Sequence, residues 1–142
     1  LALAAHCGRV YAVECEADAC ALIRRNRERF GAWNMTPVQG RAPEALAGLP
    51  APDAVFVGGS GGELADILTA AIERNPAARI CVSAVTLETL AAATAALTAA
   101  GREAEVCQIA VSHTRAAGRY HLLTAANPVF LICAKAPAGE EP

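Results

Sequence analysis

The sequence of 142 residues contains little lysine and few aromatic residues. Lys135 is the one lysine beside eleven arginines, and the formal net charge is −2. This balance gives no electrostatic case for a nucleic-acid partner, because such partners require a basic surface. No apolar stretch reaches the length of a transmembrane helix, and no signal peptide is visible. A hydrophobic content of 54% with 18% charged residues indicates a globular domain with a substantial core.

The sequence also lacks a pattern of cysteines or histidines that is typical of a metal site. None of the six cysteines forms a C-x-x-C motif, and the three histidines are scattered. Most of the cysteines lie within apolar stretches, so we expect small buried hydrophobic residues in a reducing cytosol, and not disulfides or zinc ligands. The six are Cys7, Cys15, Cys20, Cys81, Cys107 and Cys133.

Stretches with the period of a strand alternate with stretches with the period of a helix. Strands are predicted at residues 9–13, 36–38, 53–57, 79–85, 104–111 and 129–134. Helices are predicted at residues 16–30, 44–46, 63–74 and 86–100, and residues 1–7 are expected to end an earlier helix. The alternation predicts an α/β fold with a mainly parallel sheet and helices on both faces. Only a polar, irregular segment at residues 112–128 separates the last two strands, so the final strand is expected to be antiparallel.

Four glycines surround Ser60 between a buried strand and a helix, at residues 58–62. Such a glycine loop lets a ligand approach the main chain closely, and ligands bind at the carboxyl ends of strands in open α/β sheets. The helix that follows is expected to begin with a capping box between Ser60 and Glu63. The alternative is a tight strand-to-helix turn with no ligand.

Polar residues follow the first two predicted strands. Glu14 ends the first, where an acidic residue in doubly wound folds accepts hydrogen bonds from ribose hydroxyls. Gly40, Arg41 and Ala42 follow the second, where main-chain groups could meet the edge of an adenine. The alternatives are an exposed glutamate at a strand end and an ordinary loop that leads into a helix started by Pro43.

Two further groups of polar residues are expected at the same edge of the sheet. Thr86 is predicted to cap the helix that follows it. The irregular segment offers cations that suit a ligand with several carboxylates, because arginine pairs with a carboxylate through two hydrogen bonds. For each of its residues taken singly, exposure to solvent is the alternative. The candidates are Arg115, Arg119, Tyr120 and His121.

Several motifs agree in order and spacing with one known family. They are V-Y-A-V-E at 10–14, G-R-A-P-E-A at 40–45, D-A-V-F-V-G-G-S-G-G at 53–62, A-V-T-L-E-T at 84–89 and A-N-P-V-F at 126–130. Together they resemble the precorrin methyltransferases of cobalamin synthesis that methylate carbon 15 and decarboxylate the ring C acetate (precorrin-6Y C5,15-methyltransferase, decarboxylating). The resemblance implies a Rossmann-like, S-adenosylmethionine-dependent methyltransferase domain over residues 1–137, a tail at 138–142 and a homo-oligomer, often a tetramer.

The resemblance also implies which residues bind the cofactor and the substrate. The cofactor would lie against Glu14, Gly40, Arg41, Ala42, Gly58 and Gly59. The precorrin would lie against Ser60, Gly61, Thr86, Arg115, Arg119, Tyr120 and His121. Arg41 stands where such methyltransferases often have an acidic residue, so the main chain of Ala42 is the better candidate for the adenine contact.

One part of the family pattern is expected outside this sequence. The first strand and the glycine-rich loop that hold the methionine part of the cofactor would precede Leu1, so a chain that starts at Leu1 is expected to bind S-adenosylmethionine poorly. Two other functions stay open, an NAD-dependent dehydrogenase, which would also use Glu14 on a ribose, and a non-catalytic fragment.

Overall fold

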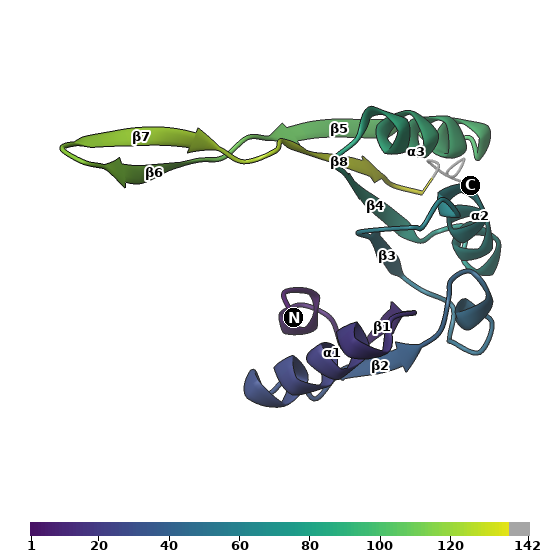
Figure 1. Ribbon diagram of the computed structural model, residues 1–142. Helices are drawn as coiled ribbons and strands as arrows, with labels where there is room; N and C mark the ends of the chain where they lie inside the picture. Colours follow the sequence, from purple (N-terminus) through teal and green to yellow (C-terminus); the bar gives the residue numbers. More distant parts are fainter. Residues whose placement is uncertain (137–142) are drawn as a thin grey trace. The chain divides into compact units, whose positions relative to one another are not determined.

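The computed structural model describes residues 1–136 and divides into two compact units, Leu1–Pro50 and Ala51–Pro142 (Figure 1). The tail expected at residues 138–142 lies outside the described residues. In the described part of the chain, no helix is long and apolar enough to cross a membrane.

The first unit is a two-stranded parallel sheet with one helix packed on it. Strands β1 (Val10–Glu14) and β2 (Met35–Gln39) pair in parallel, and helix α1 (Ala17–Arg29) connects them and contacts both. The helical end expected at residues 1–7 is instead a single 3-10 turn, η1 (Leu3–Ala5). The side-chain amide of Asn34 fixes this turn by donating to the carbonyls of Ala4 at 2.8 Å and Cys7 at 2.7 Å.

The second unit contains a four-stranded mixed sheet with the order β3-β4-β8-β5. Its sheet strands are β3 (Ala54–Val57), β4 (Arg79–Ala84), β5 (Ala104–Ile109) and β8 (Val129–Ala134). Helices α2 (Leu64–Arg74) and α3 (Leu87–Ala99) pack against each other, and α3 also contacts β4, β5 and β8 (Figure 1). The core of this unit is built from residues that are almost fully buried, Leu68, Ile80, Val82, Leu97 and Ile132.

Strand β8 confirms the prediction that the final strand is antiparallel. It lies between β4 and β5 and runs antiparallel to both, whereas β3 and β4 are parallel. Alternate residues of β4 and β8 are buried, including Ile80, Val82 and Ile132, because one face of the sheet carries the core. The α/β class predicted from the sequence is therefore confirmed.

The segment 112–128, expected to be irregular, is mostly a β-hairpin, so that prediction is wrong. Strands β6 (Ser112–Ala117) and β7 (Tyr120–Ala125) pair with each other in a sheet of their own. The hairpin extends away from the four-stranded sheet, and nearly all of its residues are exposed (Figure 1). Its two-residue turn is Gly118-Arg119, with Gly118 at φ 58°. A glycine first in a two-residue turn is a hairpin signal that the polar composition concealed.

The capping box expected at the start of α2 is also wrong. The N–H of Glu63 donates to the main-chain carbonyl of Ser60 at 3.0 Å, and not to its hydroxyl. The helix begins at Leu64, and the side chain of Glu63 makes no capping hydrogen bond. The reason lies in Gly61 and Gly62, whose φ angles of 57° and 95° bend the chain into a tight turn at this point.

Candidate functional site

In the first unit, the carboxyl ends of β1 and β2 bring Glu14 and Gly40 together. Glu14 is the last residue of β1 and pairs with Gln39, so Gly40 follows directly beside it. The N–H of Gly40 donates to the carbonyl of Glu14 at 2.9 Å. The expected neighbourhood of these two residues is therefore present, and the ribose and adenine roles stay predictions.

The carboxylate of Glu14 is oriented by the chain that follows it. Its Oε1 accepts from the main-chain N–H of Glu16 at 2.9 Å. This hydrogen bond is the main reason that the pKa of Glu14 lies below its ordinary value, because it favours the charged form. A carboxylate has about four acceptor positions, so the other oxygen stays able to accept from a pair of hydroxyl groups.

The loop after β2 is packed too tightly for a side chain at Gly40. A Cβ there would lie 2.9 Å from the Cβ of Ala45. The main-chain carbonyl of Arg41, the residue after Gly40, accepts from the N–H of Ala45 at 2.9 Å. Ala42 lies between Arg41 and Pro43 in this loop. Gly40 therefore lets the short η2 turn (Glu44–Leu46) fold back close to the end of β2.

In the second unit, the glycine loop (residues 58–62) lies at the carboxyl end of β3. A Cβ on Gly58 would lie 3.4 Å from the ring of Phe56, whereas one on Gly59 would meet nothing within 4 Å. Ser60 and Gly61 continue the loop to the turn described above. The loop is thus open at Gly59, as close approach of a ligand requires.

Thr86 lies at the same edge of this sheet, after the carboxyl end of β4, and confirms the predicted cap. Its hydroxyl oxygen accepts from the N–H of Thr89 at 3.1 Å, and Thr86 is thereby the N-cap residue of α3. The two hydroxyl groups of Thr86 and Thr89 are also 2.9 Å apart. The cap explains why α3 starts where the sequence places it.

Exposed apolar side chains at this edge were not identified from the sequence. Phe56 of β3 is 50% exposed, Val85 after β4 is 64% exposed and Leu87 in the first turn of α3 is 73% exposed. Although Leu87 has the helical spacing of Leu97, the buried residues of α3 are Ala93 and Leu97. The sequence signal that could have indicated this exposed apolar surface is Leu87, a large apolar residue directly after the capping residue Thr86.

The four candidates from the irregular segment lie on the hairpin and not beside the glycine loop. Arg115 is in β6, and Tyr120 and His121 are in β7. Arg119 is in the turn, where its guanidinium lies 5.0 Å from the ring centre of Tyr120. Strands of six residues at about 3.3 Å per residue place that turn about 20 Å from the base of the hairpin. Of the candidate substrate residues, Ser60, Gly61 and Thr86 are those that follow the carboxyl ends of β3 and β4.

Among residues 1–136, no group of three or more histidine, cysteine, aspartate or glutamate side chains is arranged to hold a metal ion. The two sheet edges present an oriented carboxylate at Glu14, open main chain at Gly59 and exposed apolar side chains.

The comparisons with known proteins identify the family and the fold. The family model described as "Precorrin methyltransferase domain" matches residues 1–135. A relative from Pyrobaculum calidifontis, named probable cobalt-precorrin-6B C(15)-methyltransferase (decarboxylating), is 48% identical over 129 residues, which are 90% of this chain and 66% of the relative. The chain thus spans about two thirds of the length of that relative.

Two solved structures have the same fold. The precorrin-6Y C5,15-methyltransferase of Geobacter metallireducens is 40% identical with a TM-score of 0.83, over 90% of this chain and 68% of that one. The protein titled precorrin 8w decarboxylase from Methanobacterium thermoautotrophicum is 36% identical with a TM-score of 0.87, over 94% of this chain and 73% of that one. The Rossmann-like methyltransferase fold is therefore confirmed, and it implies S-adenosylmethionine as the methyl donor. The dehydrogenase alternative gains no support. The chain belongs to the precorrin methyltransferase domain family.

Proposed function

We propose that this protein transfers a methyl group from S-adenosylmethionine to carbon 15 of a precorrin and promotes decarboxylation of the ring C acetate, in cobalamin biosynthesis. The observation that carries the proposal is the oriented carboxylate of Glu14 beside Gly40 at the carboxyl ends of two parallel strands, in a chain of this family. We place the reaction in the cytoplasm.

The residues at the end of the first unit's sheet fit the adenosine part of the cofactor. Glu14 would accept from the two ribose hydroxyls, because its carboxylate is ionised and held by the N–H of Glu16. The main chain from Gly40 through Arg41 to Ala42 would meet the adenine edge. When bound, S-adenosylmethionine supplies a methyl group that is already activated on a sulfonium.

The sheet edge of the second unit fits a flat, largely apolar ring. Gly59 leaves main chain uncovered by side chains, Gly58 lies beside the ring of Phe56, and Ser60, Gly61 and Thr86 supply polar groups of the same loop and helix start. Phe56, Val85 and Leu87 offer exposed apolar area that a tetrapyrrole would cover, which would exclude water from the reacting carbon.

The chemistry asks the protein to position the substrate and to exclude water. Methyl transfer requires in-line alignment of donor and acceptor carbon, and it requires no strong nucleophile from the protein. When the acetate loses carbon dioxide, the electron pair of the broken carbon–carbon bond passes into the conjugated macrocycle, which acts as the electron sink. We therefore assign positioning roles and no proton-transfer role to the residues above.

Changing Glu14 to glutamine tests the cofactor site. The amide keeps the size of the side chain but loses the charge that strengthens hydrogen bonds to hydroxyl groups. We expect the affinity for S-adenosylmethionine, measured by calorimetry on the whole protein, to fall about 10-fold or more, the usual scale for a hydrogen bond to a charged group. Glu16→Gln is the matched control and should keep the affinity, because only the main chain of Glu16 contacts Glu14. Equal affinities in a folded Glu14→Gln protein would remove the ribose role.

We also propose that Arg115 and Arg119 pair with carboxylates of the precorrin, with Tyr120 and His121 beside them. Because a desolvated arginine–carboxylate pair is far stronger than a wet one, Arg115→Ala and Arg119→Ala should each raise the KM for the precorrin about 10-fold. The affinity for S-adenosylmethionine should not change. Arg79→Ala, an exposed arginine at the start of β4, is the control. Wild-type kinetics in both hairpin variants would leave Arg41 as the next candidate.

Finally, we propose that the protein is a homo-oligomer, as the family resemblance implies, and that the hairpin of one copy contacts another copy. The exposed strands and apolar side chains of the hairpin support this proposal, and its test is given in the Discussion.

A further inference from the structure

Two cysteines face each other across neighbouring strands of the second unit. Cys81 of β4 and Cys133 of β8 are paired directly in the antiparallel register, and their Sγ atoms are 3.3 Å apart. Both lie on the face of the sheet opposite to the buried Val82 and Ile132. Cys133 is exposed and Cys81 is partly exposed, so reagents in solution reach the pair. The prediction of buried cysteines is confirmed for Cys20 only: Cys81 is partly exposed, and the prediction is wrong at the four exposed cysteines, Cys7, Cys15, Cys107 and Cys133.

The main-chain geometry of this pair permits a disulfide. Directly opposed residues of antiparallel strands have Cα atoms about 4.5–5.5 Å apart, and disulfides span Cα separations of about 4.4–6.8 Å. Bond formation therefore requires rotation of the two side chains and a sulfur approach to about 2.05 Å, without a change of register. Cys107, by contrast, is paired with Leu131 and not with a cysteine.

We propose that Cys81 and Cys133 form a reversible dithiol–disulfide pair that closes on exposure to a low-molecular-weight disulfide such as glutathione disulfide. One cysteine, as its thiolate, attacks a sulfur of glutathione disulfide, whose S–S bond breaks and releases one glutathione thiolate. The other cysteine loses its proton and attacks the resulting mixed disulfide, which releases the second glutathione. Two electrons pass from the protein to the reagent, and the new bond ties β4 to β8.

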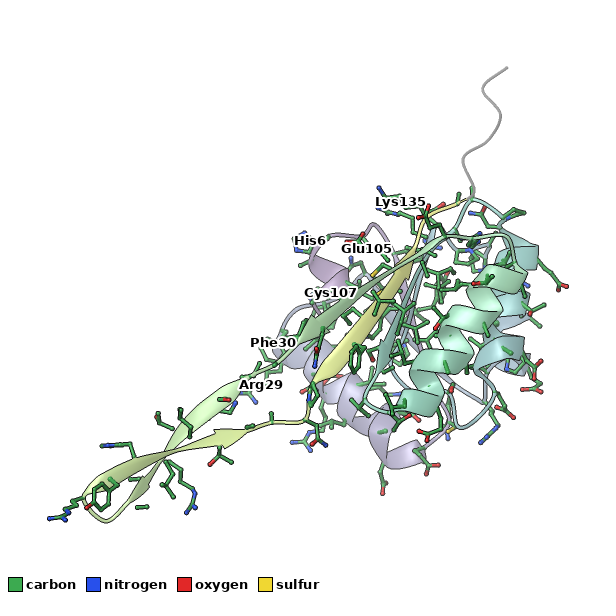
Figure 2. All side chains as sticks on the ribbon, turned by 90° about the horizontal axis from the view of Figure 1, so that it is seen from above. His6, Arg29, Phe30, Glu105, Cys107 and Lys135 are labelled. Carbon is green, nitrogen blue, oxygen red and sulfur yellow. The ribbon has the colours of Figure 1, made fainter. Side chains whose placement is uncertain are left out.

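The surroundings of the pair make the reaction slow at neutral pH. Burial first, and then the hydrogen bond and charge of Cys133, raise the pKa of Cys81 to about 11. Among the described strand residues, the charged and titratable groups that share the alternation of this pair are Arg79 of β4, and Glu105 and Cys107 of β5. Glu105 is paired with Cys133 in the register, and Figure 2 labels Glu105 and Cys107 on β5. Since the thiolate is the reactive form, the rate of closure should rise about 10-fold per pH unit between pH 7 and pH 9.

The test is thiol oxidation of the folded protein followed by mass spectrometry. After incubation with glutathione disulfide at pH 8.5, the two peptides that contain Cys81 and Cys133 should together lose about 2 Da, the mass of two hydrogens, whereas the other exposed cysteines can only gain glutathione. Digestion without reductant should give one linked peptide pair that contains Cys81 and Cys133. Added dithiothreitol should restore the original mass.

Three variants decide the assignment. Cys81→Ser and Cys133→Ser should each abolish the linked peptides and instead retain glutathione on the remaining cysteine of the pair. Cys107→Ser is the matched control, an exposed cysteine on the adjacent strand, and should close like the wild type. The proposal is overturned if the two thiols stay unmodified in the folded wild-type protein, if both retain glutathione without closing, or if Cys81→Ser still loses two hydrogens.

Discussion

Replacing Arg102 by methionine should lower the free energy of unfolding of the second unit by about 3 kcal/mol, the largest stability effect that we expect from one substitution. Arg102 is only 3% exposed and lies between α3 and β5. Its guanidinium donates to the carbonyls of Pro76 and Ala78 at 2.5 Å, and to that of Lys135 at 3.4 Å. One side chain thus joins the turn before β4 to the chain after β8.

Two effects oppose each other in this substitution. Methionine fills much of the space of the arginine stem, and it removes a buried charge whose desolvation is costly. It also leaves buried carbonyls without a donor, and each hydrogen bond to a charged group contributes about 1.5–3 kcal/mol. We expect the loss of hydrogen bonds to dominate, because both terminal nitrogens of the guanidinium make short contacts with carbonyls. Only its Nε atom is buried without a partner among the described residues.

Urea unfolding followed by circular dichroism measures the change. Arg79→Met is the control, because Arg79 is exposed at the start of β4, and it should stay within about 0.5 kcal/mol of wild type. Equal stabilities of Arg102→Met and wild type would show that desolvation of the guanidinium offsets its hydrogen bonds completely.

Replacing Leu123 by arginine should dissociate the proposed oligomer, with a dissociation constant raised at least about 100-fold. Leu123 in β7 is 77% exposed, and Tyr120 and Leu122 on the same strand are 59% and 46% exposed. A two-stranded hairpin is at best marginally stable in water, and both of its outer edges carry unpaired main-chain groups. A second copy of the chain can cover both the edges and the leucines.

Charge favours a second copy as the partner. Arg115 and Arg119 are the only formal charges of the hairpin (residues 112–125), whereas the whole chain carries −2, so the rest of each chain carries −4. A basic hairpin is therefore attracted to the acidic remainder of another copy. Light scattering at micromolar concentration should give an oligomer for wild type and for Leu22→Arg, a control at a 53% exposed leucine of α1. A monomeric wild type, or an unchanged mass for Leu123→Arg, would contradict the proposal.

The sequence predicted those features that depend on local chemistry or on chain order. Thr86 is a cap because its hydroxyl is placed by neighbouring residues, and β8 is antiparallel because no helix is available to return the chain. Glu14 and Gly40 lie together because carboxyl ends of parallel strands share an edge. The family itself was identified from the order and spacing of its motifs, which the comparisons confirm.

The features that the sequence did not predict depend on contacts between distant residues. From the sequence alone, Arg102 would be expected to be exposed like other arginines. Its burial depends on the carbonyls of Pro76 and Ala78, which lie more than twenty positions away in the chain. The hairpin has no core face, so the alternation of apolar residues that normally indicates strands is absent, and only the Gly118 turn marks it. Ser60 and Glu63 matched a capping box in spacing, but two left-handed glycines between them changed the geometry.

The position of β8 also determines the order in which the second unit can fold. Because β8 lies between β4 and β5, those two strands have no neighbour in common until residues 129–134 are in place. Cys81 and Cys133, which face each other, are 52 positions apart in the chain. Contacts of such long separation slow folding, because the entropy of closing the loop is lost before the pairing is gained. During synthesis, β4 can therefore pair with β3 but keeps its other edge unpaired until β8, the last strand of the sheet, leaves the ribosome.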